Sequence, residues 1–75
     1  MDEGAILLEL GNRIRMQRKL IGLTQEELAL VAEVDRSYYG AVERGERNIT
    51  FTVLSRLCLA LRCDIASLTK GLPPA

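Results

Sequence analysis

The chain has 75 residues, which is enough for one small hydrophobic core. We therefore expect a single domain over residues 1–75, with a folded core from about residue 4 to residue 69 and a short C-terminal tail. Because 48% of the residues are hydrophobic but only 4% are aromatic, the core must be aliphatic. Ten basic residues balance ten acidic ones, so the net charge gives no argument for a polyanionic partner.

The composition also excludes several chemistries. Histidine is absent, although it is the usual general base and metal ligand near neutral pH. We predict neither an enzyme nor a metal or cofactor site. The two thiols, Cys58 and Cys63, lack the CxxC spacing of zinc sites. Because residues i and i+5 lie on different faces of a helix, we expect no disulfide and interpret both as small apolar residues of a reduced protein.

The chain carries no signal for a membrane. No run of about 18 uninterrupted apolar residues occurs, and acidic residues follow Met1 where a signal peptide would carry basic ones. We expect a soluble, cytoplasmic protein without a membrane partner.

The predicted elements are all helical, because both prolines lie at residues 73–74 and no alternating pattern or hairpin turn indicates a strand. The first helix ends at Gly22. Its apolar stripe consists of Leu7, Leu10, Ile14 and Ile21. Thr24 begins a capping box with Glu27, which predicts a second helix from about Gln25 to Ala32.

Three further caps complete the prediction. Asp35 predicts a third helix from about Arg36 to Arg44, which Gly45 ends. Thr50 and Asp64 are the predicted caps of a fourth and a short fifth helix. Five helices with short connections predict an all-α bundle.

The second and third helices are short, and only three residues, 33–35, connect them. This spacing is typical of a helix-turn-helix but also fits an ordinary αα-hairpin. The distribution of charge favours the former. Residues 20–35 contain four acids and no base, whereas residues 36–62 contain five bases and two acids, and residues 13–19 contain four bases and no acid. The net charge is therefore zero because segments of opposite charge cancel. A charged partner responds to the local electrostatic field of a surface and not to the net charge of the chain.

Eight of the ten basic residues are arginines, which suit forked contacts with phosphate or guanine. For Arg13, Arg15 and Arg62, a solvated helix face is the simpler interpretation. Arg36 differs because it lies in the first turn of the third helix, where a cation opposes the helix dipole. This placement indicates an external anion or base edge.

Arg18 lies on the apolar stripe of the first helix, between Ile14 and Ile21. A buried guanidinium needs a carboxylate, and Glu43 near the end of the third helix is the candidate. We predict a partly buried Arg18–Glu43 ion pair that fixes the first helix against the third. The alternative is that Arg18 reaches water without a partner.

Three segments together resemble the Cro/CI-type (Xre) helix-turn-helix family: Thr-Gln-Glu-Glu-Leu-Ala from Thr24, Asp-Arg-Ser-Tyr-Tyr from Asp35, and Val-Glu-Arg-Gly from Val42. The resemblance covers about Leu10 to Leu68 and implies a five-helix, lambda-repressor-like bundle. The short chain and the run Glu-Arg-Gly-Glu-Arg-Asn are most similar to the controller proteins of restriction-modification systems. Stand-alone Xre regulators and antitoxins share much of this pattern.

The resemblance implies roles for particular residues. It implies base contacts in the major groove by Arg36, Ser37 and Tyr38, with a half-buried packing role as an equal alternative for Tyr38. It implies phosphate contacts by Gln25, Arg44, Arg47, Asn48 and Thr50. An Arg–Glu pair between the first and third helices is also common in this family. The dimer interface that it implies comprises Leu61, Ile65, Leu68 and Leu72, although these residues could equally complete the core of one chain.

Two places depart from the family pattern. Glu33 occupies a turn position that often carries Gly or Asn, because the backbone there is left-handed, and we expect a cost on the order of 1 kcal/mol. Gly40 and Ala41 have no polar group for base contacts. Direct readout would then rest on Arg36 and Ser37, and DNA shape would supply more of the specificity.

We therefore expect a homodimeric, sequence-specific regulator of transcription that binds double-stranded DNA and acts on its own operator. The operator would have two-fold symmetry, with half-sites roughly 34 Å apart. No cofactor is expected, and RNA polymerase is a candidate partner. The alternative is an antitoxin or other stand-alone Xre-type repressor that binds a protein partner through the last two helices.

Overall fold

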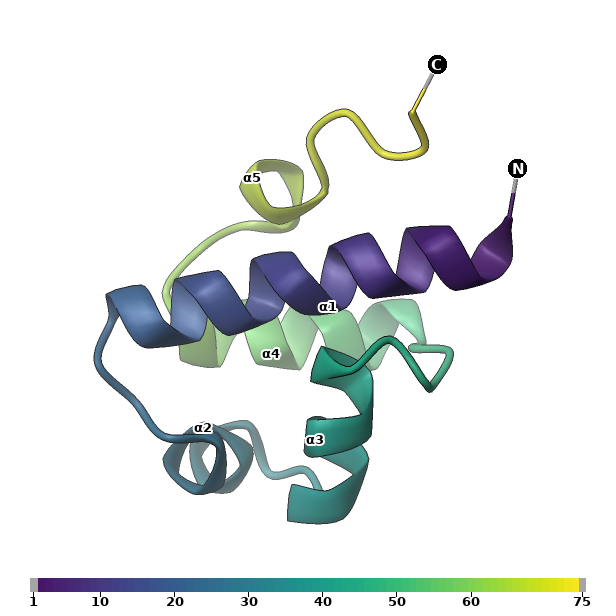
Figure 1. The fold of residues 1–75 in the computed structure, drawn as a ribbon. Helices are drawn as coiled ribbons and strands as arrows, with labels where there is room; N and C mark the ends of the chain where they lie inside the picture. The colour runs from purple at the N-terminus through teal and green to yellow at the C-terminus, as the bar shows by residue number, and fades with distance from the viewer. Residues whose placement is uncertain (1, 75) are drawn as a thin grey trace.

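The structure is a computed structural model that describes residues 2–74, and within this range it contains five helices and no strand. The helices are α1 (Glu3–Leu20), α2 (Gln25–Ala32), α3 (Arg36–Glu43), α4 (Phe51–Leu61) and α5 (Ile65–Thr69). The long α1 crosses the middle of the molecule and packs against α4, with α2 and α3 on one side of it and α5 on the other (Figure 1). The predicted all-α fold is confirmed.

Each helix begins after a side chain that accepts a hydrogen bond from an amide of the first turn. The caps are Asp2, Thr24, Asp35, Thr50 and Asp64. The last four were predicted from the sequence, because capping depends on residue type and local spacing alone. These caps fix where the chain changes direction, and therefore how α3 is presented.

The first four helices end on a left-handed turn. Two of these turns use a side chain in place of glycine, at Glu33 (φ 59°) and Arg62 (φ 60°), and the left-handed backbone at Glu33 is as predicted. At the end of α4, the Cys63 amide donates to the Cys58 carbonyl (3.1 Å) and the Arg62 amide donates to the Leu59 carbonyl (3.3 Å). This pair of bonds defines a Schellman motif, which brings the residue after the turn back against the last helical turn.

The Schellman motif corrects our interpretation of the two cysteines. We expected Cys58 and Cys63 on different faces of one helix, and this is wrong because the chain leaves α4 at Arg62. Cys63 instead folds back beside Cys58. Both thiols are free, with Cys58 buried and Cys63 half-buried.

The core lies where α1, α2, α3 and α4 meet, and it is aliphatic apart from one ring. The largest fully buried side chains are Tyr39, Ile14, Leu28, Leu57, Leu61 and Glu43. A Cβ on Gly11 would lie 2.4 Å from the carbonyl oxygen of Glu43 and 2.6 Å from that of Val42. Only glycine therefore permits α1 to approach the end of α3 so closely, and this contact sets the angle at which α3 leaves the bundle.

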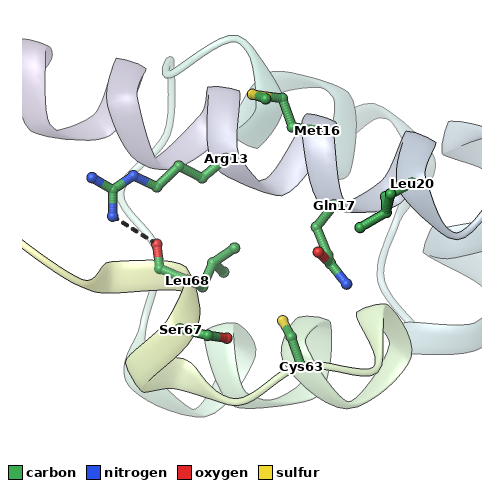
Figure 2. Close-up of a pocket in the computed structure, with 7 residues that line it drawn as sticks. All are labelled: Arg13, Met16, Gln17, Leu20, Cys63, Ser67 and Leu68. Carbon is green, nitrogen blue, oxygen red and sulfur yellow. Dashed lines mark hydrogen bonds between the residues drawn. The ribbon is translucent and has the colours of Figure 1, made fainter.

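Arg13 has a structural role that we did not predict. Its Nη1 donates to the carbonyl oxygens of Leu68 (3.1 Å) and Lys70 (2.6 Å), and its Nε pairs with Glu9 (2.8 Å). Figure 2 shows the bond from Arg13 on α1 to Leu68 on α5. The interpretation of Arg13 as a solvated side chain was wrong, because its guanidinium binds the end of α5 to α1.

Among residues 2–74, no helix is both long and apolar enough to cross a membrane. In the same range, no three acidic or cysteine side chains are grouped as ligands for a metal ion.

Candidate nucleic-acid interface

The helices α2 and α3 are held as one unit by local hydrogen bonds and by α4. In the capping box, the Glu27 amide donates to Thr24 Oγ1 (3.0 Å) and the Thr24 amide donates to Glu27 Oε1 (2.8 Å). The hydrogen bond from the Thr24 amide to its carboxylate lowers the pKa of Glu27. At the other end of α2, Arg56 of α4 donates from Nη2 to the carbonyl oxygens of Glu33 (2.5 Å) and Ala32 (3.2 Å). Both ends of α2 are therefore fixed, and the turn that leads to α3 is bound to α4.

The first turn of α3 points Arg36 and Ser37 out of the bundle and Tyr39 into it. Asp35 caps the helix by accepting from the Tyr38 amide (2.9 Å). Arg36 and Ser37 are exposed, Tyr38 is half-buried, and Tyr39 is fully buried. The helix is thus anchored by Tyr39, while Arg36 and Ser37 face solvent.

The guanidinium groups of two exposed arginines converge over Gly40, which is itself buried. A Cβ on Gly40 would lie 2.9 Å from Nη1 of Arg36, 3.2 Å from Nη1 of Arg44 and 3.7 Å from Oε1 of Gln25. Within residues 2–74, Arg36 has no carboxylate partner, while Arg44 Nε pairs with the exposed Glu46 (3.1 Å), a contact that water screens strongly. Like charges so arranged repel one another, and an anion or an electronegative base edge placed between them would relieve this repulsion.

The side chain of Gln25 is shared between this surface and the interior. Its Nε2 donates to Glu43 Oε1 (2.8 Å), so one amide hydrogen is used inside the protein. The second hydrogen remains available, and Oε1 faces the position above Gly40. Gln25 is therefore held in one orientation at the edge of the exposed face.

Beneath the surface, Glu43 is the centre of a buried polar network that joins α1, α2 and α3. Arg18 contacts it twice, from Nε to Oε2 (2.6 Å) and from Nη2 to Oε1 (3.1 Å), and the Tyr39 hydroxyl donates to Oε2. Arg18 Nη1 also donates to the Leu23 carbonyl (2.9 Å). Within residues 2–74, no fully buried side-chain polar atom lacks a partner, as a buried charged network requires.

The ionisation of this network follows from its hydrogen bonds. Burial disfavours the Glu43 carboxylate, but hydrogen bonds from Arg18, Tyr39 and Gln25 together outweigh burial and lower the pKa of Glu43. The hydrogen bond to Glu43 raises the pKa of Arg18, and burial and Glu43 raise the pKa of Tyr39. At neutral pH the network therefore holds a charged pair and a neutral phenol.

The loop after α3 carries the remaining residues for which the family resemblance implies contacts with DNA. The Arg47 guanidinium carbon lies 5.1 Å from the centre of the Tyr38 ring, within range of a cation–π contact. The Tyr38 hydroxyl is 3.5 Å from the Asn48 carbonyl, and Thr50 Oγ1 accepts from the Val53 amide (3.1 Å). Arg47, Asn48 and Thr50 are all exposed. This loop thus continues the surface of α3, and Tyr38 connects the two.

The residues expected at a dimer interface divide into two groups. Leu61 and Leu68 are 0% and 5% exposed, so they complete the core of one chain and offer no surface to a partner. Ile65 and Leu72 are half-buried. Part of the predicted interface is therefore corrected: the sequence pattern marks apolar positions but does not distinguish a core from a contact between chains.

The roles of two residues that are important to this surface were not predicted from the sequence. We considered Gly40 only as a missing polar group, although the spacing of residues 36, 40 and 44 by four places Arg36, Gly40 and Arg44 on one helix face. Arg56 was counted with the charges around α3, whereas its guanidinium binds backbone carbonyls. No local signal in the sequence could have revealed that contact, because its partners lie 23 and 24 residues away.

The known proteins to which this chain is similar agree with one another. The family described as helix-turn-helix matches residues 14–68. Control protein C.SmaI of Serratia marcescens is 40% identical over 68 residues, which cover 91% of this chain and 77% of that protein. The crystal structure of the restriction-modification controller protein C.AhdI from Aeromonas hydrophila matches with a TM-score of 0.83 and 42% identity, over 85% of this chain and 97% of that one. The C.Esp1396I controller protein, solved as a tetramer in complex with its natural 35 base-pair operator, matches with a TM-score of 0.78 and 30% identity, over 84% of this chain and 83% of that one.

Proposed function

Because this chain belongs to the helix-turn-helix family, and within it to the control proteins of restriction-modification systems, we propose that it regulates transcription by binding the operator of its own gene. This family consists of DNA-binding regulators and is not a class of enzymes. The observation that carries the proposal is the convergence of the exposed Arg36 and Arg44 guanidinium groups over the buried Gly40 of α3. A double helix, with its phosphates and guanine edges, supplies the negative groups that this surface needs.

In this proposal the N-terminal half of α3 enters the major groove. Arg36 reads a base edge, most favourably the O6 and N7 atoms of guanine. Ser37 contacts a neighbouring base, and Tyr38 contacts a base at the edge of the groove. Because Gly40 has no side chain, the two guanidinium groups can lie close together over the α3 backbone, where one phosphate or base edge could meet both. With few polar side chains available, part of the specificity comes from DNA shape.

The residues around α3 hold the DNA backbone. Gln25 donates its second amide hydrogen to a phosphate at the start of α2, where backbone amides point in the same direction. The other phosphate contacts are made by Arg44, Arg47, Asn48 and Thr50. These contacts orient the protein without reading sequence. The Arg18–Glu43 pair supports them indirectly, because Glu43 fixes Gln25.

We propose that the regulator acts as a homodimer. Two copies related by a two-fold axis would place their α3 helices in successive major grooves, roughly 34 Å apart. The relative C.Esp1396I, which binds its operator as a tetramer, supports assembly on DNA. Ile65 and Leu72 are the predicted interface residues that retain exposed surface, so they are the ones we assign to the contact.

The same function places the protein beside a promoter in the cytoplasm, where RNA polymerase is a further partner of the proposal. The exposed acidic residues of α2, Glu26 and Glu27, would be repelled by DNA, and they are the side chains we assign to a basic surface of the polymerase. Glu26→Gln should bind the operator at least as tightly as the wild type and reduce the effect on transcription in vitro. Equal transcription by both proteins would remove this partner from the proposal.

The experiment that tests the proposal is a gel-shift titration against the DNA upstream of the gene, repeated at several salt concentrations. A dimer that holds about six to eight phosphates should lose affinity with a slope of roughly −0.9 per phosphate in log affinity against log salt. The control is a duplex of equal length and composition with both half-sites scrambled. Equal affinity for the two duplexes would contradict a sequence-specific regulator.

A further inference from the structure

Cys58 lies in α4 and Cys63 in the connection from α4 to α5, so neither belongs to α3 or to the loop after it, which carry the proposed DNA surface. They sit on either side of the turn that ends α4, at the two positions that a Schellman motif brings into contact. With standard bond lengths, the 3.1 Å hydrogen bond from the Cys63 amide to the Cys58 carbonyl keeps their Cα atoms within about 7 Å. This separation is within the range over which two cysteines can be bridged.

The Cys63 thiol also faces a groove. A cavity of about 400 Å³ lies between α1 and the α4–α5 connection. Its lining consists of Arg13, Met16, Gln17, Leu20, Cys63, Ser67 and Leu68. Figure 2 shows the Cys63 side chain directed into this space opposite Gln17. A small molecule in the groove would therefore meet the Cys63 sulfur first, with Cys58 buried behind it.

From this arrangement we infer that Cys63 is a site of modification by low-molecular-weight disulfides, and that Cys58 is the resolving thiol which converts the modified protein into an intramolecular Cys58–Cys63 disulfide. Oxidised glutathione and cystine belong to this class of reagent. The groove admits the reagent, and the turn holds the second thiol in place for the second step.

The chemistry consists of two thiol–disulfide exchanges. The Cys63 thiolate attacks one sulfur of the reagent, the reagent S–S bond breaks, and one small thiol leaves with a proton from solvent. Cys58 then loses its proton and attacks the Cys63 sulfur, which releases the second small thiol. The protein is oxidised by two electrons and the reagent is reduced to two thiols, so the reaction needs no other oxidant.

The two thiols should react at different rates. Burial, together with the neighbouring Cys63, raises the pKa of Cys58 to about 12, and only a thiolate attacks. Cys58 is therefore a poor first nucleophile. Cys58 attacks in the second step because the turn holds it beside the modified Cys63 sulfur. The mixed disulfide should accumulate briefly before it resolves.

The test treats reduced protein with oxidised glutathione, quenches the reaction by alkylation, and follows intact mass over time. The wild type should pass through a singly glutathionylated form and end as a monomer lacking two hydrogens. Cys58→Ala should stop at the glutathionylated form. Cys63→Ser should react about ten-fold or more slowly than the wild type. Circular dichroism of each variant checks that its helices are intact.

Three outcomes would overturn the inference. The first is that Cys63→Ser reacts as fast as the wild type. The second is that the wild type keeps both thiols free until it is denatured, which would mean that the groove is closed, for example by a second copy of the chain. The third is a disulfide between chains in place of one within a chain. Because the reaction is measured without DNA, its failure would leave the proposed regulator function unaffected.

Discussion

The Arg18 guanidinium donates two hydrogen bonds to the Glu43 carboxylate, from Nε to Oε2 at 2.6 Å and from Nη2 to Oε1 at 3.1 Å. The residues lie 25 positions apart in sequence, and their pairing joins the long α1 to the end of α3. The Glu43 side chain is 1% exposed and that of Arg18 is 10% exposed. This pair therefore fixes the helix that carries Arg36, and it does so without contacting the proposed DNA surface itself.

Removing the charge of Glu43 should destabilise the fold strongly. Glu43→Gln leaves Arg18 as a buried charge without a carboxylate, and losing one partner of such a pair typically costs about 3–5 kcal/mol. Urea denaturation followed by circular dichroism measures the loss. The double variant Arg18→Met, Glu43→Gln should recover much of it, because no charge is then left unpaired. A loss below about 1 kcal/mol in the single variant would show that the pair is not critical.

The same pair predicts how stability depends on acid. The pKa of Glu43 is lower in the folded protein than its ordinary value of 4.5, so the folded state favours the carboxylate. This stabilisation is complete above the unfolded pKa and is lost as pH falls through the folded pKa. Unfolding free energies measured from pH 7 to pH 3 should therefore fall more steeply for the wild type than for the Arg18→Met, Glu43→Gln variant.

Other carboxylates do not disturb that comparison. The capping residues Glu27 and Asp64 also have lowered pKa values, because of hydrogen bonds with Thr24 and Ser67. They titrate in both proteins, so their contribution cancels in the difference. Parallel pH profiles would contradict the role assigned to Glu43.

Gly40→Ala should separate stability from DNA binding. Alanine in a helix is about 0.5–1 kcal/mol more favourable than glycine. The new Cβ would lie too close to the terminal nitrogens of Arg36 and Arg44, which can move, and at an ordinary 3.7 Å from Oε1 of Gln25. The variant should melt at a higher temperature. Because both guanidinium groups must move aside, operator affinity should fall by roughly ten-fold.

The matched control is Gly4→Ala in the first turn of α1. Its Cβ would meet nothing closer than 3.4 Å, so this substitution should stabilise the protein and leave operator affinity unchanged. If Gly40→Ala binds the operator as tightly as Gly4→Ala, the convergence of the two arginines over Gly40 has no role in recognition.

The turn between α2 and α3 contains stored strain that a single substitution should release. Glu33 has φ 59°, a conformation that costs a side-chain residue about 1–2 kcal/mol. Glu33→Gly should release this strain and raise the free energy of unfolding by about 0.5–1 kcal/mol. The gain is smaller than the strain because glycine loses more backbone entropy on folding. Thermal unfolding measures the change, and a lower melting temperature would indicate that the Glu33 side chain makes a stabilising contribution.

The features predicted correctly from the sequence depend on neighbours along the chain. Thr24 and Asp35 mark the starts of α2 and α3 because a cap needs only the residues of its own first turn. The Arg18–Glu43 pair joins residues 25 positions apart, and it is predictable for a different reason: a charge on an apolar stripe needs an opposite charge. Local rules thus define the helices, and the need to pair a buried charge defines one long-range contact.

The features that were missed depend on the path of the chain in three dimensions. The turn at Arg62 brings Cys63 back beside Cys58. Helical periodicity does not predict this, because it describes only residues that stay within one helix. Arg13 binds carbonyl oxygens 55 and 57 residues away, and backbone carbonyls are present at every position, so no residue type identifies them. Burial of Leu61 likewise depends on how α5 folds back over α1.

The central claim is that α3 reads DNA through Arg36, and the measurement that tests it most directly is the operator affinity of Arg36→Ala. The exposed Arg15 on α1 provides the control, because Arg15→Ala removes the same charge away from α3. We predict that Arg36→Ala loses about 1–3 kcal/mol of specific binding while its circular dichroism and melting temperature stay unchanged. Arg15→Ala should bind as the wild type does. Equal operator affinity of Arg36→Ala, Arg15→Ala and the wild type would contradict the account.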